Sequence, residues 1–227
     1  MIPAIIYLIL RRYRKTNPVK AAQLLQLFRT ARKFILLFVL LLLAGLIALS
    51  QPTQLRYTIK RKGNQVGSIS FFQQVVGTKK IFRTESEVKT RMIFLFTAIG
   101  REEAIYENGV LLSSSVYQKL NGDVRLDNKT RLVGRNYVVY NGKHPETLNN
   151  YPISYNMICL FGIEPATVPK VYSDKFQQFL EIQTVKNHQY RIKFPDGNFN
   201  EYFYKDGLCT RVEVHHSLYR SSFELKN

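Results

Sequence analysis

Charged and uncharged residues alternate strictly along several stretches in the later part of the chain. In IFRTESEVKTR, residues 81–91, the charges fall on odd positions, and the even positions carry apolar residues or small hydroxyls. The stretches VRLDNKTRL, 124–132, and YRIKF, 190–194, repeat this period of two. Neighbouring residues of a strand point to opposite faces of a sheet, so the pattern indicates strands with one solvated face. Such strands are typical of antiparallel sheets.

Turn signals separate these stretches at short intervals. Asn-Gly and Asp-Gly pairs tolerate the positive φ angles that tight hairpin turns require. The pairs are Asn108-Gly109, Asn121-Gly122, Asn141-Gly142, Asp196-Gly197 and Asp206-Gly207, and Gly134 lies between two of them. Their regular spacing predicts a β-meander, in which each strand pairs with the next along the chain.

Two segments depart from the strand pattern. YPISYNMICLFGIEP predicts a helix of about two turns between Ser154 and Gly162, and VYSDKFQQFL fits a helix or a strand. The proline-rich stretch 141–169 interrupts the meander, so we expect it to cross from one region of the sheet to another. The predicted fold is therefore all-β with one short helix: a curved antiparallel sheet or open barrel formed by a meander of hairpins over residues 51–227.

The run from Phe34 to Ser50 is apolar and uncharged. A spanning helix needs about 20 such residues, with a lower limit near 17, whereas a signal peptide needs a shorter apolar core followed by small residues at the cut. Ala48 and Ser50 occupy the small-residue positions before a cut ahead of Gln51. We favour a removed signal peptide, with an inner-membrane anchor that contacts the membrane through 34–50 as the alternative. Either interpretation exports 51–227 to the periplasm or outer envelope.

Much of the positive charge belongs to the N-terminal extension, residues 1–33. The chain has 33 Lys and Arg against 16 Asp and Glu, a net charge of +17. Eight of the basic residues and no acid precede the apolar run, which leaves residues 51–227 with 25 basic and 16 acidic residues, or +9. The extension is either a cytoplasmic segment or the product of a start codon assigned too far upstream. Beyond it, basic and acidic residues are interspersed, so we expect no nucleic-acid partner.

The sequence contains no recognisable catalytic or cofactor signature. His215 and His216 are adjacent on a predicted strand, so they point to opposite faces and cannot easily share a metal ion. The Glu102-Glu103 pair is interpreted as a solvated strand end. Neither a Gly-x-Ser-x-Gly motif nor a glycine-rich phosphate loop is present. We therefore expect no catalytic residues, no metal and no cofactor, and a non-enzymatic role.

The two cysteines allow two interpretations. Cys159 and Cys209 are compatible with one disulfide in an oxidising compartment. Each lies among apolar neighbours in the sequence. We therefore favour two buried thiols.

The predicted inner face combines small hydroxyl residues with aromatic and aliphatic ones. This mixture suits a curved sheet around a cavity, and the alternative is a small-residue core packed by the helical segment near Met157. The candidate ligand-lining residues are Phe82, Thr84, Ser86, Val88, Thr90, Met92, Phe94, Ser114, Leu126, Asn128 and Thr130.

The order of motifs resembles an exported family of Gram-negative envelopes. The motifs are RYTIKRKGNQVGSI, ESEVKTRMIFLF, EAIYENGVLLSSSVYQKLNGDV, ISYNMICLFGIEP and FPDGNFNEYFYKDGLCTRVEV. Over residues 55–225 the chain is similar to the domain of unknown function 6134 family. The resemblance implies a signal peptide, an antiparallel β fold and no assigned activity or site residue. The long extension ahead of the apolar run departs from that family and favours a misplaced start. A further analogy, to lipoprotein-carrier half-barrels, rests on the expected fold alone.

These observations suggest three functions. The first is a non-enzymatic carrier or binding module for an apolar or amphiphilic ligand. The second is a structural or interaction module whose charged outer face, including Arg83 to Arg91 and Arg125 to Arg131, contacts an envelope protein. The third is a hydrolase with an unrecognised site. A cavity lined by the inner face would favour the first function, a filled interior the second, and a convergent acid, base or histidine cluster in a cleft the third.

Overall fold

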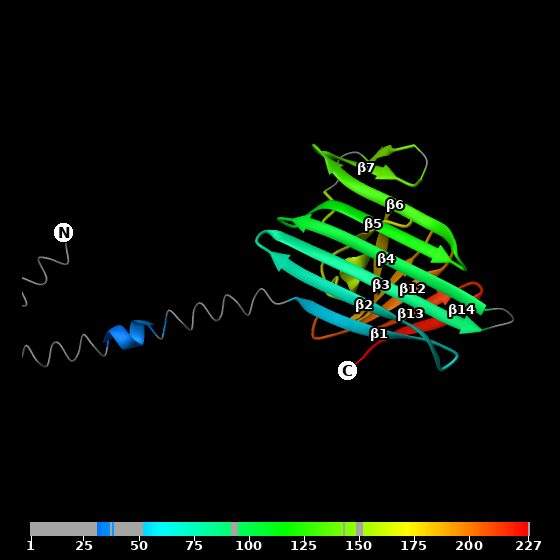
Figure 1. Cartoon of the computed structure of the whole chain (residues 1–227), viewed down its shortest axis with the longest axis horizontal. Coiled ribbons are helices and arrows are strands. Elements are labelled where there is room, and N and C mark those ends of the chain that lie inside the picture. Colours follow the sequence, from blue (N-terminus) through cyan, green and yellow to red (C-terminus); the bar gives the residue numbers. More distant parts are fainter. Residues whose placement is uncertain are drawn as a thin grey trace, which may run out of the picture. The chain divides into compact units, whose positions relative to one another are not determined.

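A computed structural model of the chain describes residues 31–36, 38, 52–91, 95–142, 144–148 and 152–226 (Figure 1). The chain divides into two compact units, Met1–Gln51 and Pro52–Asn227. In the first unit, residues 31–36 and 38 are helical. Among the described residues, no helix combines the length and the apolar composition needed to cross a membrane. The expected cut after Ser50 lies outside the described residues, so the choice between signal and anchor stays a prediction.

The second unit is a single 14-stranded sheet with one short helical segment. The first strands are β1 (Thr53–Arg61), β2 (Asn64–Val76), β3 (Lys79–Arg91), β4 (Leu95–Glu107), β5 (Val110–Leu120), β6 (Asp123–Val133), β7 (Asn136–Tyr140) and β8 (Glu146–Leu148). After the 3₁₀ helix η1 (Met157–Phe161) come β9 (Lys170–Ser173), β10 (Gln178–Lys186), β11 (Gln189–Lys193), β12 (Phe199–Lys205), β13 (Leu208–His216) and β14 (Tyr219–Leu225).

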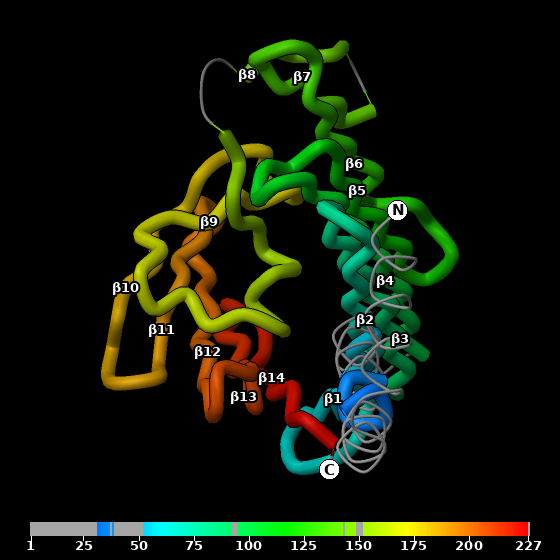
Figure 2. Tube along the Cα trace, turned by 90° about the vertical axis from the view of Figure 1, so that its left-hand side faces the viewer, coloured from blue at the N-terminus to red at the C-terminus, as the bar shows by residue number. Residues whose placement is uncertain are grey.

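The sheet is a meander whose first strand, β1, lies in the interior of the sheet between β2 and β14. Its strand order is β8-β7-β6-β5-β4-β3-β2-β1-β14-β13-β12-β11-β10-β9, and neighbouring strands pair antiparallel. The chain runs outward from β1 to one edge, crosses to the other edge, and returns strand by strand to pair β14 with β1 (Figures 1 and 2). The predicted meander, open curved sheet and crossing segment are therefore confirmed.

The predicted turn residues lie between strands and use the backbone conformations that Asn, Asp and Gly permit. Asn108 and Gly109, between β4 and β5, have φ angles of 50° and 81°. The turn between β1 and β2 uses Lys62, with φ of 48°, and Gly63, with φ of 80°. Our search for Asn-Gly and Asp-Gly pairs missed this turn because lysine carries no comparable signal.

The crossing segment passes between the two walls of the curved sheet (Figure 2). Its helix η1 covers Met157–Phe161, which is shorter than the predicted span from Ser154 to Gly162. Ile158, Cys159 and Leu160 of this helix are buried. The stretch 171–180, for which helix and strand were both open, forms β9, a turn and the start of β10.

Tyrosine hydroxyls attach the crossing segment to both walls. The hydroxyl of Tyr204 on β12 donates to the carbonyl of Leu160 at 2.7 Å. The hydroxyl of Tyr57 on β1 donates to the carbonyls of Cys209 at 2.7 Å and Phe161 at 3.3 Å. A buried carbonyl without a donor costs about 1–3 kcal/mol. These side chains therefore satisfy the irregular backbone that the helix leaves unpaired.

The surroundings of two glycines on the inner face differ, so we expect their replacement by alanine to lower the stability of the protein by different amounts. At Gly67 the new Cβ would lie 2.2 Å from the carbonyl oxygen of Glu87, whereas at Gly100 it would meet only Ser86 Oγ, at 2.5 Å. Because backbone cannot rotate away, we expect Gly67→Ala to lower the free energy of unfolding by roughly 1–3 kcal/mol and Gly100→Ala by less than about 1 kcal/mol. Urea unfolding followed by circular dichroism measures both. Equal losses would contradict the close approach of β2 to β3.

Candidate functional site

The inner face of β3 to β6 carries the residues that the alternation placed there. Phe82, Thr84, Ser114, Asn128 and Thr130 are buried. Ser86, Val88, Thr90 and Leu126 are half-buried, and Met92 and Phe94 lie outside the described residues. Their placement matches the predicted parity, and their role in binding a ligand stays a prediction.

At one end of the interior, the crossing segment and the residues after β9 supply the polar partners of this face. The amide of Asn128 donates to the carbonyls of Asp174 and Lys175, both at 3.0 Å. Thr130 Oγ1 and the Tyr172 hydroxyl share a hydrogen bond of 3.1 Å, and Ser114 Oγ donates to the Asp174 carboxylate. At this end the small polar side chains are therefore paired with protein groups from residues 172–175.

Asn156 connects Asp174 to the crossing segment. Its amide donates to Asp174 Oδ2 at 2.8 Å, while its carbonyl oxygen accepts from the Tyr106 hydroxyl at 2.8 Å. Both carboxylate oxygens of Asp174 thus accept a hydrogen bond. Burial nevertheless raises the pKa of Asp174 to about 6, although the hydrogen bonds from Ser114 and Asn156 act in the opposite direction.

The two cysteines are free and buried, as we expected from their apolar surroundings. Burial raises the pKa of Cys159 to about 11 and that of Cys209 to about 12. Both groups are therefore protonated thiols at neutral pH. A thiol is a much weaker nucleophile than a thiolate, so neither cysteine resembles a reactive centre.

Glu102 is the inner-face residue that we misjudged from the sequence. It lies in the interior of β4, directly opposite Thr84 on β3 and Val116 on β5, and not at a solvated strand end. It is half-buried. Burial, reinforced by the charge of Asp174, raises the pKa of Glu102 to about 7. Within the described part of the chain, its carboxylate makes no hydrogen bond or ion pair.

Small residues surround Val88 on the same inner face, toward the end of the sheet away from η1. Val88 is paired with Gly67 on β2 and with Ala98 on β4. Ser86 is paired with Gly100, two residues before Glu102. Val88 packs against the buried core, and farther along the same face the rings of Phe71, Phe82 and Tyr106 pack together.

The outer face of β3 to β5 contains a depression of about 580 Å³. Its lining consists of Arg83, Thr84, Glu85, Arg101, Glu102, Glu103, Ser115 and Tyr117. Most of these residues have the outward parity, and Arg83 Nε contacts Glu103 Oε2 at 2.5 Å. The depression is therefore a charged surface feature of the outer face.

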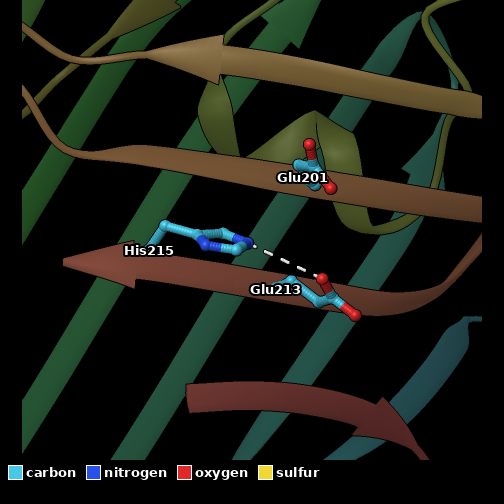
Figure 3. A group of neighbouring side chains, drawn as sticks. All are labelled: Glu201, Glu213 and His215. Atoms are coloured by element: carbon cyan, nitrogen blue, oxygen red, sulfur yellow. Dashed lines mark ion pairs between the residues drawn. The ribbon is translucent and has the colours of Figure 1, made fainter. Parts of the chain in front are cut away.

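A third set of polar residues, Glu201, Glu213 and His215, gathers on the outer face of β12 and β13 (Figure 3). Our expectation that His215 and His216 lie apart holds, since His215 stacks on Phe199 and His216 stacks on Tyr219. Sequence reasoning did not find the set because Glu201 joins it through strand pairing. Among the residues that the structure describes, Glu201, Glu213 and His215 form a group that could hold a metal ion.

The interior network could be predicted only in part. Glu102 has the same parity as Ala104 and Tyr106, so the sequence already contained an indication that Glu102 points inward. Asp174 and Asn156 lie in segments without regular alternation, so their convergence on Ser114 had no local signal.

Comparison with known proteins identifies the fold and the family. Residues 57–226 match the family described as Domain of unknown function (DUF6134). A solved β-barrel-like protein of the domain of unknown function DUF1849 from Brucella abortus is similar to the chain, with a TM-score of 0.51 and 10% sequence identity. That similarity covers 78% of this chain and 96% of the other, and at this identity it shows a shared fold alone. No curated protein matches the chain.

The raised pKa of Glu102 predicts a pH dependence of stability. The folded state holds this proton more tightly than the unfolded chain, so Glu102 makes the free energy of unfolding fall as pH rises from 4.5 to about 7. We expect Glu102→Gln to remove this contribution, on the order of 2 kcal/mol after allowing for partial exposure. Urea unfolding at pH 4.5 and 7.5 measures it.

The matched control for this measurement is Glu103→Gln, on the outer face of the same strand. Its pH dependence should follow that of the unmodified protein. If Glu102→Gln and the unmodified protein lose stability equally between the two pH values, the assignment of the raised pKa to Glu102 is wrong.

Proposed function

The chain belongs to the family of the domain of unknown function DUF6134, and we propose that it is a non-enzymatic carrier or binding module of the cell envelope. Its ligand is a small amphiphile held on the inner face near Glu102. The observation that carries this proposal is the half-buried Glu102 carboxylate, which has no partner in the described part of the protein.

The ligand chemistry follows from the surroundings of Glu102. Burying a carboxylate is costly unless a donor or a positive charge compensates it. A ligand with an ammonium or hydroxyl head group would supply that donor. The small residues around Val88 would leave room for the apolar part of the same molecule.

The arrangement of the two interior acids supports binding more than hydrolysis. Acid–base hydrolysis of the two-carboxylate kind needs both groups free to reach the substrate. Here Asp174 is engaged by Ser114 and Asn156, which leaves Glu102 as the free member of the pair. We therefore place no catalytic residue in the interior.

The proposed location rests on the N-terminal sequence. The apolar run 34–50, with Ala48 and Ser50 before Gln51, supports export to the periplasm or outer envelope. If the run is retained, it would anchor the protein in the inner membrane. In both cases residues 51–227 would meet ligands of the envelope.

The depression on the outer face supports a second candidate function, a structural or protein-interaction module. Arg101 and Tyr117 contribute to its lining, and both residue types are frequent among the residues that dominate binding energy at protein interfaces. The partner would be an envelope protein with a mixed-charge surface. This function requires no ligand on the inner face.

The carrier proposal predicts that the full-length chain in mild detergent binds a fluorescent alkylamine at micromolar concentration. Val88→Trp should abolish binding, because the indole would fill the space beside Gly67 and Ala98. Glu102→Gln should weaken binding at least tenfold, because it removes the negative charge that compensates the ammonium group. Fluorescence anisotropy of the alkylamine measures its binding to the unmodified protein and to both variants.

Ile99→Trp is the matched control, since Ile99 is exposed on β4, beside the inward-facing Ala98. It should bind like the unmodified protein. An unmodified protein that binds no alkylamine would remove the carrier proposal in favour of the interaction module. A Val88→Trp variant that unfolds would show that the interior beside Val88 is a packed core.

The interaction proposal predicts position-specific crosslinking in the cells that make the protein. A photoreactive phenylalanine in place of Tyr117 should give one adduct of defined mass, and Arg101→Glu should reduce its yield at least fivefold by reversing a contact charge. The same probe in place of Phe203, on the outer face of β12, is the control. Equal adducts at both positions would show that the depression is no specific interface.

A further inference from the structure

Three potential metal ligands converge on the outer face of the opposite wall (Figure 3). Glu201 on β12 is the direct cross-strand partner of Glu213 on β13. His215 follows Glu213 by two residues, so it points from the same face of the strand. One ligand atom from each residue lies within 4.8 Å of the other two.

The pairing of Glu201 with Glu213 places like charges directly opposite each other, which is destabilising in a sheet. Arginines offset this repulsion from the sides. Arg191 Nε donates to Glu201 Oε1 at 2.8 Å, and Arg211 Nη2 lies 3.3 Å from Glu213 Oε1. Both arginines approach the Oε1 atoms and so orient the carboxylates. Glu201 Oε2 accepts a hydrogen bond from Gln189 Nε2 at 3.2 Å, which a bound ion would have to displace, while Glu213 Oε2 faces His215.

The imidazole of His215 supplies an independent observation, because one of its ring nitrogens is buried without a hydrogen bond. Its Nε2 atom exposes less than 1 Å² to solvent and makes no hydrogen bond in the described structure. It lies 3.6 Å from Glu213 Oε2, which is beyond hydrogen-bond distance but within the range of an ion pair when the ring is protonated (Figure 3). The ring is held in this orientation by stacking on Phe199, with centroids 4.2 Å apart and planes 10° apart. A buried ring nitrogen fixed in this way is costly unless it binds something.

We propose that Glu201, Glu213 and His215 form a binding site for a divalent transition-metal ion of the Zn²⁺ type. Two carboxylates and one imidazole are ligands that Zn²⁺ accepts, and a water molecule would complete four-coordination. Tetrahedral geometry at these bond lengths places ligand atoms about 3.4 Å apart, so small side-chain rotations would close the site. The ion would separate the two carboxylates and take the lone pair of His215 Nε2.

The flanking arginines also set the expected strength of the site. Together Arg191 and Arg211 carry as much positive charge as the two carboxylates carry negative charge. The ion therefore enters a site with little net attraction, and we expect micromolar rather than nanomolar affinity. This site is separate from the proposed ligand site, since its residues have the outward parity while Glu102 points inward.

The test is a titration of the full-length chain in mild detergent with ZnCl₂, followed by isothermal calorimetry. We expect one ion per chain, and we expect His215→Gln and Glu213→Gln each to weaken binding at least tenfold. His216→Gln is the matched control and should bind as tightly as the unmodified protein, because His216 points to the other face. Titration with Co²⁺ should give the intense visible absorption of a four-coordinate ion in the unmodified protein and not in His215→Gln.

Circular dichroism of each variant establishes that it is folded before titration. Zn²⁺ should raise the melting temperature of the unmodified protein and of His216→Gln but not of His215→Gln. The proposal is overturned if the unmodified protein binds no Zn²⁺ at micromolar concentration. It is equally overturned if folded His215→Gln binds Zn²⁺ as tightly as the unmodified protein does.

Discussion

The hydrogen bonds that Asp174 accepts from Ser114 and Asn156 are the constraint on which the interior depends. Ser114 belongs to the outgoing half of the meander, Asn156 to the crossing segment, and Asp174 to the turn that starts the returning half. One carboxylate therefore ties together three parts of the chain that are distant in sequence. Without this link, the Ser114 hydroxyl and the Asn156 amide would each lose a buried hydrogen-bond partner, at a cost of about 1–3 kcal/mol for each group.

The position of the crossing segment divides the interior into two regions of different character. At the end occupied by η1, tyrosine hydroxyls and Asn128 satisfy the irregular backbone, and aromatic rings fill the remaining space. Toward the other end, the inner face carries glycine, alanine and serine beside a carboxylate without a partner. The same fold thus provides a rigid packed end and, next to it, the surface on which we place the ligand.

Strand β12 shows how one strand can present different chemistry on its two faces. Tyr202 faces the interior and Glu201 faces outward, and both are buried. Because adjacent strand residues point in opposite directions, the chemistry of the two faces can vary independently. The proposed ligand site and the proposed metal site therefore share a scaffold without sharing a side chain.

The sequence by itself determined the strands with strict alternation, the hairpin turns marked by Asn-Gly or Asp-Gly pairs, and the two faces of β3 and β6, because alternation and turn chemistry are local properties of neighbouring residues. It also located the crossing segment by the interruption of that pattern. Only the tertiary structure decided which ends of the meander meet, that the charges of Glu102 and Asp174 interact, and that Glu201 joins Glu213 and His215. These contacts depend on strand register and on closure between residues far apart in the chain, and a one-residue shift in register would send each side chain to the other face.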